Sequence, residues 1–249
     1  MSAEDARHGL HVYRTAESLA RRVAEFARAG LERGEPAVLV PRRENREPLM
    51  AELRRLGLDP EALAAEGRLI VCDADANAER CLAAVPSSVD ALWKEFAACL
   101  AALRARGFAR FTVWGETPDV LLKAGAPALS LDLESRWADE TAAQGVTLLC
   151  SLRGDLRESK LYTAELADAC AHHTHVEALE DEAAVVAADA RLNEALGTPL
   201  ARLVSALAEE SAASLAAMPA PLARMLWVAD HMPATARKIL AAEKTKAKA

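Results

Sequence analysis

The sequence has few aromatic residues: phenylalanine, tyrosine and tryptophan make up 4% of its 249 residues, although 52% are hydrophobic. Alanine, leucine and valine must therefore supply most of the buried surface, which is typical of a helix-rich soluble protein. The sequence also has no excess of positive charge, since its formal net charge is -7. An acidic surface gains nothing by releasing phosphate counterions, so we expect no nucleic-acid partner.

Long apolar segments and paired cysteines are absent too. No segment reaches the roughly 18 uninterrupted apolar residues of a membrane helix, and the opening MSAEDARHGLHVYR has no secretory apolar run. We therefore expect a cytoplasmic protein without a membrane partner. The five cysteines form no C-x-x-C pair, which argues against a zinc ribbon or a disulfide framework. Cys72 and Cys150 stand in apolar runs, where cysteine usually acts as a small buried hydrophobe.

What the sequence does contain is a series of short apolar runs separated by helical patterns. The runs are LHVY (10–13), AVLV (37–40), LIVC (69–72), FTVW (111–114) and VTLLC (146–150). Most of their apolar residues are consecutive, which is typical of strands buried on both faces of a parallel sheet. The helical segments between them end at glycines, which gives the strand–helix–strand order of an α/β fold. We predict a three-layer αβα sandwich with a mostly parallel sheet.

After about residue 155 the sequence shows no further strand pattern. LYTAELADACAHHTH is predicted to be one helix, and the Ala-rich remainder to form three or four short helices with breaks near Gly197-Thr198-Pro199, Met218-Pro219 and Met232-Pro233. We therefore predict one domain over 1–177 and a small all-α extension over 178–249, with a flexible basic tail. Leu200, Leu203, Val204 and Leu207 form an apolar stripe that packs on its own domain or meets a signalling partner or a second copy.

Ligands of open parallel sheets bind beyond the carboxyl ends of the strands, where loops and helix N-termini converge. The polar residues at these ends are Tyr13, Arg14, Thr15, Arg42, Arg43, Asp73, Glu116, Ser151 and Arg153. Each of them also fits a solvated loop or a helix cap. His8 and His11 are three positions apart, so a strand would point their side chains to opposite faces. They are therefore poor joint ligands of one metal ion, and we expect one of the two to be a polar partner in a pocket.

The turn Tyr13-Arg14-Thr15 lacks the glycines and the lysine of the phosphate-binding loop G-x-x-x-x-G-K-[ST]. ATP hydrolysis by that route is therefore not expected. Thr15 is placed to cap the next helix, whose free N–H groups tolerate a phosphate or carboxylate near Arg14. The alternative is an atypical nucleotide-binding enzyme in which Arg14, Arg42 or Arg43 replaces the lysine. No esterase, zinc-protease or dinucleotide motif is present, so the sequence favours a non-catalytic protein without a cofactor.

The tract from Cys170 to His175 raises a third possibility, a metal site. If this tract is helical, Asp168, His172 and His175 share one face at spacings that suit a divalent ion. The favoured interpretation is a helix C-terminus, where histidines meet the negative end of the helix dipole. The sequence therefore predicts no metal site, with these three residues as its weak candidates.

Several motifs occur in an order that resembles one family. They are H-x-x-x-x-Y (8–13), AGLERGEPAVLV, LGLD followed by GRLIVCDAD, FTVWGE, LESRWAD, TLLCSL and ADACAHHTH. Over about residues 8–177 they resemble the MEDS domain, a sensory module related to RecA/KaiC-type ATPases that lacks their phosphate loop. The resemblance implies a RecA-like sheet and a non-catalytic sensor of a small organic or anionic ligand, often attached to a kinase or a DNA-binding output.

The positions that match the family pattern are His8, Tyr13, Gly34, Glu35, Gly115, Glu116, Glu134, Trp137, Cys150 and a histidine at 173–175. The sequence departs from the pattern at Ala138, where members tend to carry Asn, and no kinase or helix-turn-helix pattern follows. For Glu116 we expect a hydrogen bond to the ligand, to His8 or to Tyr13, or else a structural contact. The predicted ligand site comprises His8, His11, Tyr13, Arg14, Thr15, Arg42, Asp73, Glu116, Glu134, Trp137 and Ser151, and occupancy is passed on through the C-terminal helices.

Overall fold

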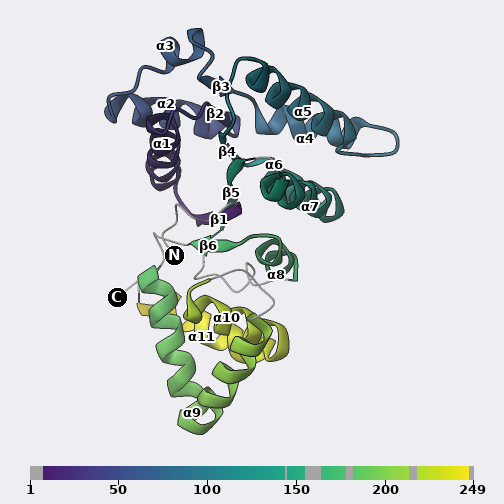
Figure 1. Ribbon diagram of the computed structural model, residues 1–249. Coiled ribbons are helices and arrows are strands. Elements are labelled where there is room, and N and C mark those ends of the chain that lie inside the picture. The colour runs from purple at the N-terminus through teal and green to yellow at the C-terminus, as the bar shows by residue number, and fades with distance from the viewer. Residues whose placement is uncertain (1–7, 144, 155–163, 178–181, 213–217, 247–249) are drawn as a thin grey trace. The chain divides into compact units, whose positions relative to one another are not determined.

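A computed structural model describes residues 8–143, 145–154, 164–177, 182–212 and 218–246 (Figure 1). The chain divides into two compact units. The first unit consists of Met1–Gly9 and Thr15–Leu152, and the second of Leu10–Arg14 and Arg153–Ala249. Within the described ranges, no helix combines the length and apolar character needed to cross a bilayer.

The strands form a six-stranded sheet in the order β3-β2-β4-β5-β1-β6. Their bounds are β1 His8–Tyr13, β2 Ala37–Val40, β3 Leu69–Val71, β4 Phe111–Gly115, β5 Val146–Arg153 and β6 His175–Glu177. Strand β2 pairs in parallel with β3 and β4, and β4 pairs in parallel with β5. Because the register places Val40 opposite Gly115 and Gly115 opposite Cys150, these three residues form one row. This row lies at the carboxyl ends of β2 and β4, whereas β5 continues beyond Cys150 to Arg153.

The described part of the first unit also contains seven helices. They are α1 Ala16–Glu32, α2 Arg43–Arg55, α3 Pro60–Ala65, α4 Ala74–Ala83, α5 Asp90–Ala105, α6 Thr117–Lys123 and α7 Pro127–Ala143. Figure 1 shows α1 and α2 on one side of the strands and α4 to α7 on the other. The predicted αβα sandwich is therefore confirmed. Three of these helices, α3, α4 and α6, have ten residues or fewer.

Helix α1 shows how the sequence fixes this layer. Thr15 caps it, since its hydroxyl oxygen accepts a hydrogen bond from Ser18 N at 3.3 Å, as the sequence indicated. Leu19, Val23 and Ala27 are buried along one face. A Cβ added at Gly30 would lie 1.9 Å from Thr112 Oγ1, so only glycine lets this part of the helix approach β4.

The second unit contains β6 and the helices α8 Ala164–Ala171, α9 Glu182–Ala212, α10 Ala220–His231 and α11 Pro233–Lys246. Helix α10 packs against α9 and α11. Gly197, with a φ of 71°, interrupts α9 at the predicted break. The tail predicted to be flexible is helical as far as Lys246, and residues 247–249 lie outside the described part.

One prediction for this region is wrong. Helix α8 ends at Ala171 instead of running through His175, and His175–Glu177 form the sixth strand. Histidine and threonine are weak helix formers, and the alternation of a three-residue strand is too short to be recognised in the sequence. The domain boundary between residues 177 and 178 stays a prediction.

Candidate functional site

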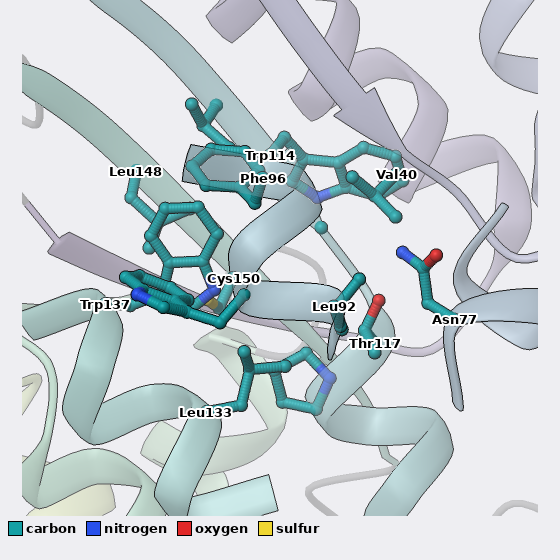
Figure 2. Close-up of a pocket in the computed structure, with 14 residues that line it drawn as sticks. Val40, Asn77, Leu92, Phe96, Trp114, Thr117, Leu133, Trp137, Leu148 and Cys150 are labelled. Carbon is teal, nitrogen blue, oxygen red and sulfur yellow. The ribbon is translucent and has the colours of Figure 1, made fainter. Parts of the chain in front are cut away.

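The first unit contains a hollow at the carboxyl ends of β2 and β4, beside the middle of β5, and we call it the aromatic pocket (Figure 2). It is lined by Val40, Asn77, Leu92, Trp93, Phe96, Val113, Trp114, Gly115, Thr117, Pro118, Leu133, Trp137, Leu148 and Cys150. Its wall on the sheet side includes the row of Val40, Gly115 and Cys150. Helices α5, α6 and α7 supply most of the remaining wall.

Aromatic rings make up much of this lining although the chain has few of them. Trp137 meets Phe96 edge-on with ring centroids 4.2 Å apart, and it meets Trp93 edge-on at 5.1 Å. Edge-to-face pairs of rings are favourable because the positive edge of one ring faces the negative face of the other. Trp93 and Phe96 are half-buried, so the pocket borders on solvent along α5.

The pocket is small and mostly apolar. The space open to the centre of a water-sized sphere is about 40 Å³. A single water needs roughly 10–15 Å³ on this measure, so the cavity suits a molecule of a few heavy atoms and is far too small for a nucleotide. Figure 2 shows Phe96, Leu133 and Trp137 around the hollow, with Asn77 and Thr117 as polar groups.

Cys150 connects the aromatic pocket to a buried polar cluster. Its Sγ lies 3.4 Å from Glu134 Oε2 and 3.5 Å from His8 Nε2. His8 Nε2 also lies 3.2 Å from Glu134 Oε2, so the three side chains form a closed triangle, which we call the His8–Glu134–Cys150 triad. Burial, together with the neighbouring Glu134 carboxylate, raises the pKa of the Cys150 thiol well above its ordinary value. The residue expected to be a small buried hydrophobe therefore has polar contacts.

Glu116 lies next to the pocket wall but serves a different network. Its side chain is fully buried, and it accepts hydrogen bonds from Arg42 N at 2.8 Å and from Asn45 Nδ2 at 2.8 Å. Arg42 also bonds to Asp119 through Nη2. These bonds tie the turn after β2 to the end of β4. The contacts fit the structural role that the sequence left open for Glu116, and they connect it to the predicted site residue Arg42.

Two further predicted residues also make local contacts. Asp73 caps α4, since it accepts a hydrogen bond from Ala76 N at 2.8 Å, and its other oxygen lies 3.0 Å from Arg43 Nε. These bonds hold the pKa of Asp73 below its ordinary value although partial burial opposes the shift. The Ser151 hydroxyl accepts the indole N–H of Trp114 at 2.9 Å.

Three other predicted residues lie in or directly after strand β1, and all three belong to the second unit. His11 and Tyr13 are buried, with ring centroids 6.3 Å apart, and Tyr13 O accepts a hydrogen bond from Gly154 N at 2.8 Å. Arg14 follows the strand and is exposed. The turn Tyr13-Arg14-Thr15, which takes the place of the phosphate loop of an ATPase, therefore begins with the bulky buried ring of Tyr13.

The histidine tract differs from its expected arrangement. Because α8 ends at Ala171, Asp168, His172 and His175 do not share a helical face. His175 begins β6, where its Nε2 lies 4.0 Å from Glu177 Oε2. His173 is buried, and its Nδ1 lies 2.6 Å from Ala169 O.

Sequence reasoning missed most of the pocket. Of its lining residues, only Trp137 belongs to the predicted ligand site, whereas Trp93 and Asn77 carried no motif. The spacing of Trp93 and Phe96, three residues apart on one helical face, could have indicated an aromatic wall. The same spacing is also typical of ordinary core packing.

Comparison with known proteins supports the motif-based resemblance. The profile of the MEDS family, described as the methanogen/methylotroph, DcmR sensory domain, matches residues 7–174. This range contains the whole aromatic pocket and the His8–Glu134–Cys150 triad. A comparison with curated proteins gives no match. Since the profile covers well over half of the sequence, the chain belongs to the MEDS family of sensory domains.

Proposed function

We propose that this chain senses a small, largely apolar organic molecule that binds in the aromatic pocket. The observation that carries the proposal is the pocket itself: three tryptophans and a phenylalanine gather around a cavity at the carboxyl ends of β2 and β4. Parallel sheets bind ligands at that edge. Apolar walls with a few polar groups are typical of small-molecule sites, and here Asn77 and Thr117 supply the polar groups.

The size of the cavity supports a ligand of a few heavy atoms. A nucleotide or another large anion needs several times more volume and a set of phosphate-binding donors. The polar groups of the lining include no lysine or arginine. A neutral organic ligand therefore fits this lining better than an anion, which narrows the ligand class expected from the sequence.

The second part of the proposal is that occupancy is passed on through the C-terminal helices to a protein partner or a second copy. Leu200 and Leu203 support it, because they are 41% and 53% exposed on α9. A ligand can shift such an equilibrium only if it binds two conformations with different affinity. The interaction should therefore change when the pocket is filled.

The direct test measures binding of neutral probes of increasing size, such as ethanol, 1-butanol, benzene and toluene, to the full chain. Tryptophan fluorescence and thermal unfolding report binding, since a ligand at 100 times its Kd stabilises the native state by about 2.7 kcal/mol. We expect saturable binding with a size optimum. Absence of saturable binding by every probe would overturn the proposal.

Gly115→Ala provides a variant that fills the pocket without straining the backbone. A Cβ at Gly115 meets Val40 Cβ at 3.5 Å, which is an ordinary contact, and both residues line the cavity. The added methyl group should lower probe affinity about tenfold, since one methylene in an apolar site is worth about 1–3 kcal/mol. Trp227→Phe, in α10 and outside the pocket lining, is the matched control and should leave the affinity unchanged.

A further inference from the structure

The His8–Glu134–Cys150 triad brings three kinds of donor atom together in the interior of the first unit. His8 begins β1, Glu134 belongs to α7 and Cys150 lies in β5, so residues far apart in sequence converge on one point. Their exposed fractions are 1%, 2% and 3%. Polar groups buried to this extent need partners that satisfy them. An imidazole nitrogen, a carboxylate oxygen and a thiol sulfur are also the donor types that bind divalent transition metals.

The distances within the triad match one face of a tetrahedral metal site. With bonds of about 2.0–2.1 Å to nitrogen and oxygen and about 2.3 Å to sulfur, a tetrahedral ion separates its nitrogen and oxygen donors by about 3.3 Å and sulfur from either by about 3.5 Å. The observed separations are 3.2 Å for His8 Nε2 to Glu134 Oε2, 3.5 Å for His8 Nε2 to Cys150 Sγ and 3.4 Å for Cys150 Sγ to Glu134 Oε2. All three edges therefore agree with the metal geometry to about 0.1 Å.

Hydrogen bonds alone account for only part of this triangle. The thiol of Cys150 donates to Glu134 Oε2, and His8 Nε2, in the tautomer that carries its proton there, donates to the same oxygen. The third edge, from sulfur to nitrogen at 3.5 Å, is then at most the weaker arm of a shared hydrogen bond. A cation between the three atoms makes every edge favourable.

Charge balance favours a divalent ion. Bound to a metal, Cys150 is a thiolate and Glu134 a carboxylate, while His8 ligates as a neutral imidazole. Two negative charges and one M²⁺ give a neutral buried cluster, which avoids the cost of an unpaired charge in the interior. Binding releases the thiol proton to solvent.

We propose that His8 Nε2, Glu134 Oε2 and Cys150 Sγ bind a divalent transition-metal ion, for which Zn²⁺ is the best match. The mixed N, O and S donor set favours Zn²⁺ over Mg²⁺ or Ca²⁺, which prefer oxygen ligands alone. Three protein ligands leave a tetrahedral ion one position for a further donor. Because Cys150 also lines the aromatic pocket, the ion would lie beside the proposed ligand site. The metal site itself does not depend on the proposed function; only its relation to the ligand does.

The test uses the full chain, first stripped with a chelator and then titrated with Zn²⁺ and with Co²⁺ in the absence of any organic probe. We expect one ion per chain by elemental analysis, and one proton released for each ion bound. Bound Co²⁺ should give a thiolate-to-cobalt charge-transfer band in the near ultraviolet and intense visible bands of tetrahedral Co²⁺. Failure to bind either ion stoichiometrically would overturn the proposal, whereas failure of the organic probes would overturn only the proposed function.

Three variants identify the ligands. Cys150→Ser should abolish the charge-transfer band and lower Zn²⁺ affinity more than 100-fold, and His8→Asn should lower it to a similar extent. Glu134→Gln should lower affinity at least tenfold while the charge-transfer band stays. The matched control is Cys81→Ser, a buried cysteine of the same unit outside the triad, and it should keep both the band and the affinity. A band that survives Cys150→Ser and disappears in Cys81→Ser would also overturn the assignment.

Discussion

The hydroxyl of Thr112, the second residue of β4, donates a hydrogen bond to Glu35 Oε2 at 2.7 Å, and both side chains are buried. Arg33 adds two hydrogen bonds to the same carboxylate, at 3.1 and 2.9 Å, and Arg110 Nε adds one at 3.0 Å. Glu35 thus links the end of α1 to β4. The Gly34-Glu35 pair belongs to the family motifs. It has structural contacts at the amino ends of the strands, opposite to the pocket, since Glu35 precedes β2.

Glu35 should make stability depend on pH. Burial raises the pKa of Glu35, but the hydrogen bonds from Arg33 and Thr112 and the charges of Arg33 and Arg110 outweigh burial and lower the pKa below its ordinary value of 4.5. A carboxyl whose pKa is lower in the folded state stabilises the protein above the unfolded-state pKa, and this contribution is lost as pH falls through the folded pKa. Glu35→Gln should lower the free energy of unfolding by about 1–3 kcal/mol near neutral pH.

Urea unfolding at neutral pH and at pH values below 4.5 measures this effect. The difference between wild type and Glu35→Gln should shrink on acidification, and a difference that stays constant would contradict the argument. Glu61→Gln is the control. Its ion pair with Arg54 is exposed, so its loss should cost less than about 1 kcal/mol at either pH.

Gly30→Ala should destabilise the protein although alanine is the better helix former. Alanine gains about 1 kcal/mol of helix propensity over glycine. A Cβ at Gly30, however, would lie 2.6 Å from Thr112 Cβ as well as 1.9 Å from its hydroxyl oxygen. Thr112 is held by Glu35, so α1 must move, and overpacking of this kind costs about 1–3 kcal/mol. Thermal unfolding should therefore show a lower Tm for Gly30→Ala. Ala29→Gly, at the neighbouring half-buried position, is the comparison and should lose only the propensity difference.

Glu116→Gln should destabilise the fold rather than act through a ligand. Glutamine offers one acceptor oxygen where Arg42 N and Asn45 Nδ2 both need one, and its amide group would face these donors. Removing one partner of a buried charged network costs about 3 kcal/mol or more, which chemical denaturation would measure. Asp75→Asn is the control, because Asp75 accepts from Arg43 N at an exposed site and should cost far less. An unchanged stability for Glu116→Gln would show that this network is dispensable.

The sequence predicted the elements of this fold better than the site that they build. Strands such as Ala37–Val40 and Phe111–Gly115 were recognisable because both faces of a parallel sheet are covered, which requires consecutive apolar residues. The sixth strand, His175–Glu177, has three residues and no such run. Helices α3 and α4 begin at Asp59-Pro60 and Asp73, which are ordinary cap signals, but both helices are too short for a clear apolar period.

The site could be predicted only in part because it depends on long-range convergence. His8, Glu134 and Cys150 were each singled out through the family pattern, yet nothing in their spacing places them within hydrogen-bond distance of one another. Trp93 and Trp137 lie on α5 and α7, and their contact exists only after both helices have packed on the same face of the sheet. A rim defined from strand ends alone included Glu116 and Ser151, which hydrogen-bond to Asn45 and Trp114, but it did not include the cavity lining beside them.

The alternative of an atypical nucleotide-binding enzyme leads to the last prediction. ATP with Mg²⁺ should show no saturable binding to the full chain by calorimetry. The turn after β1 offers no glycine or lysine, and one of the first N–H groups of α1, that of Ser18, already donates to the Thr15 hydroxyl. The exposed Arg14 alone is a weak anion site in water. Micromolar binding of ATP that is lost in Arg14→Ala would reverse this conclusion, and Arg28→Ala, on the exposed face of α1, would be the control for a general loss of positive charge.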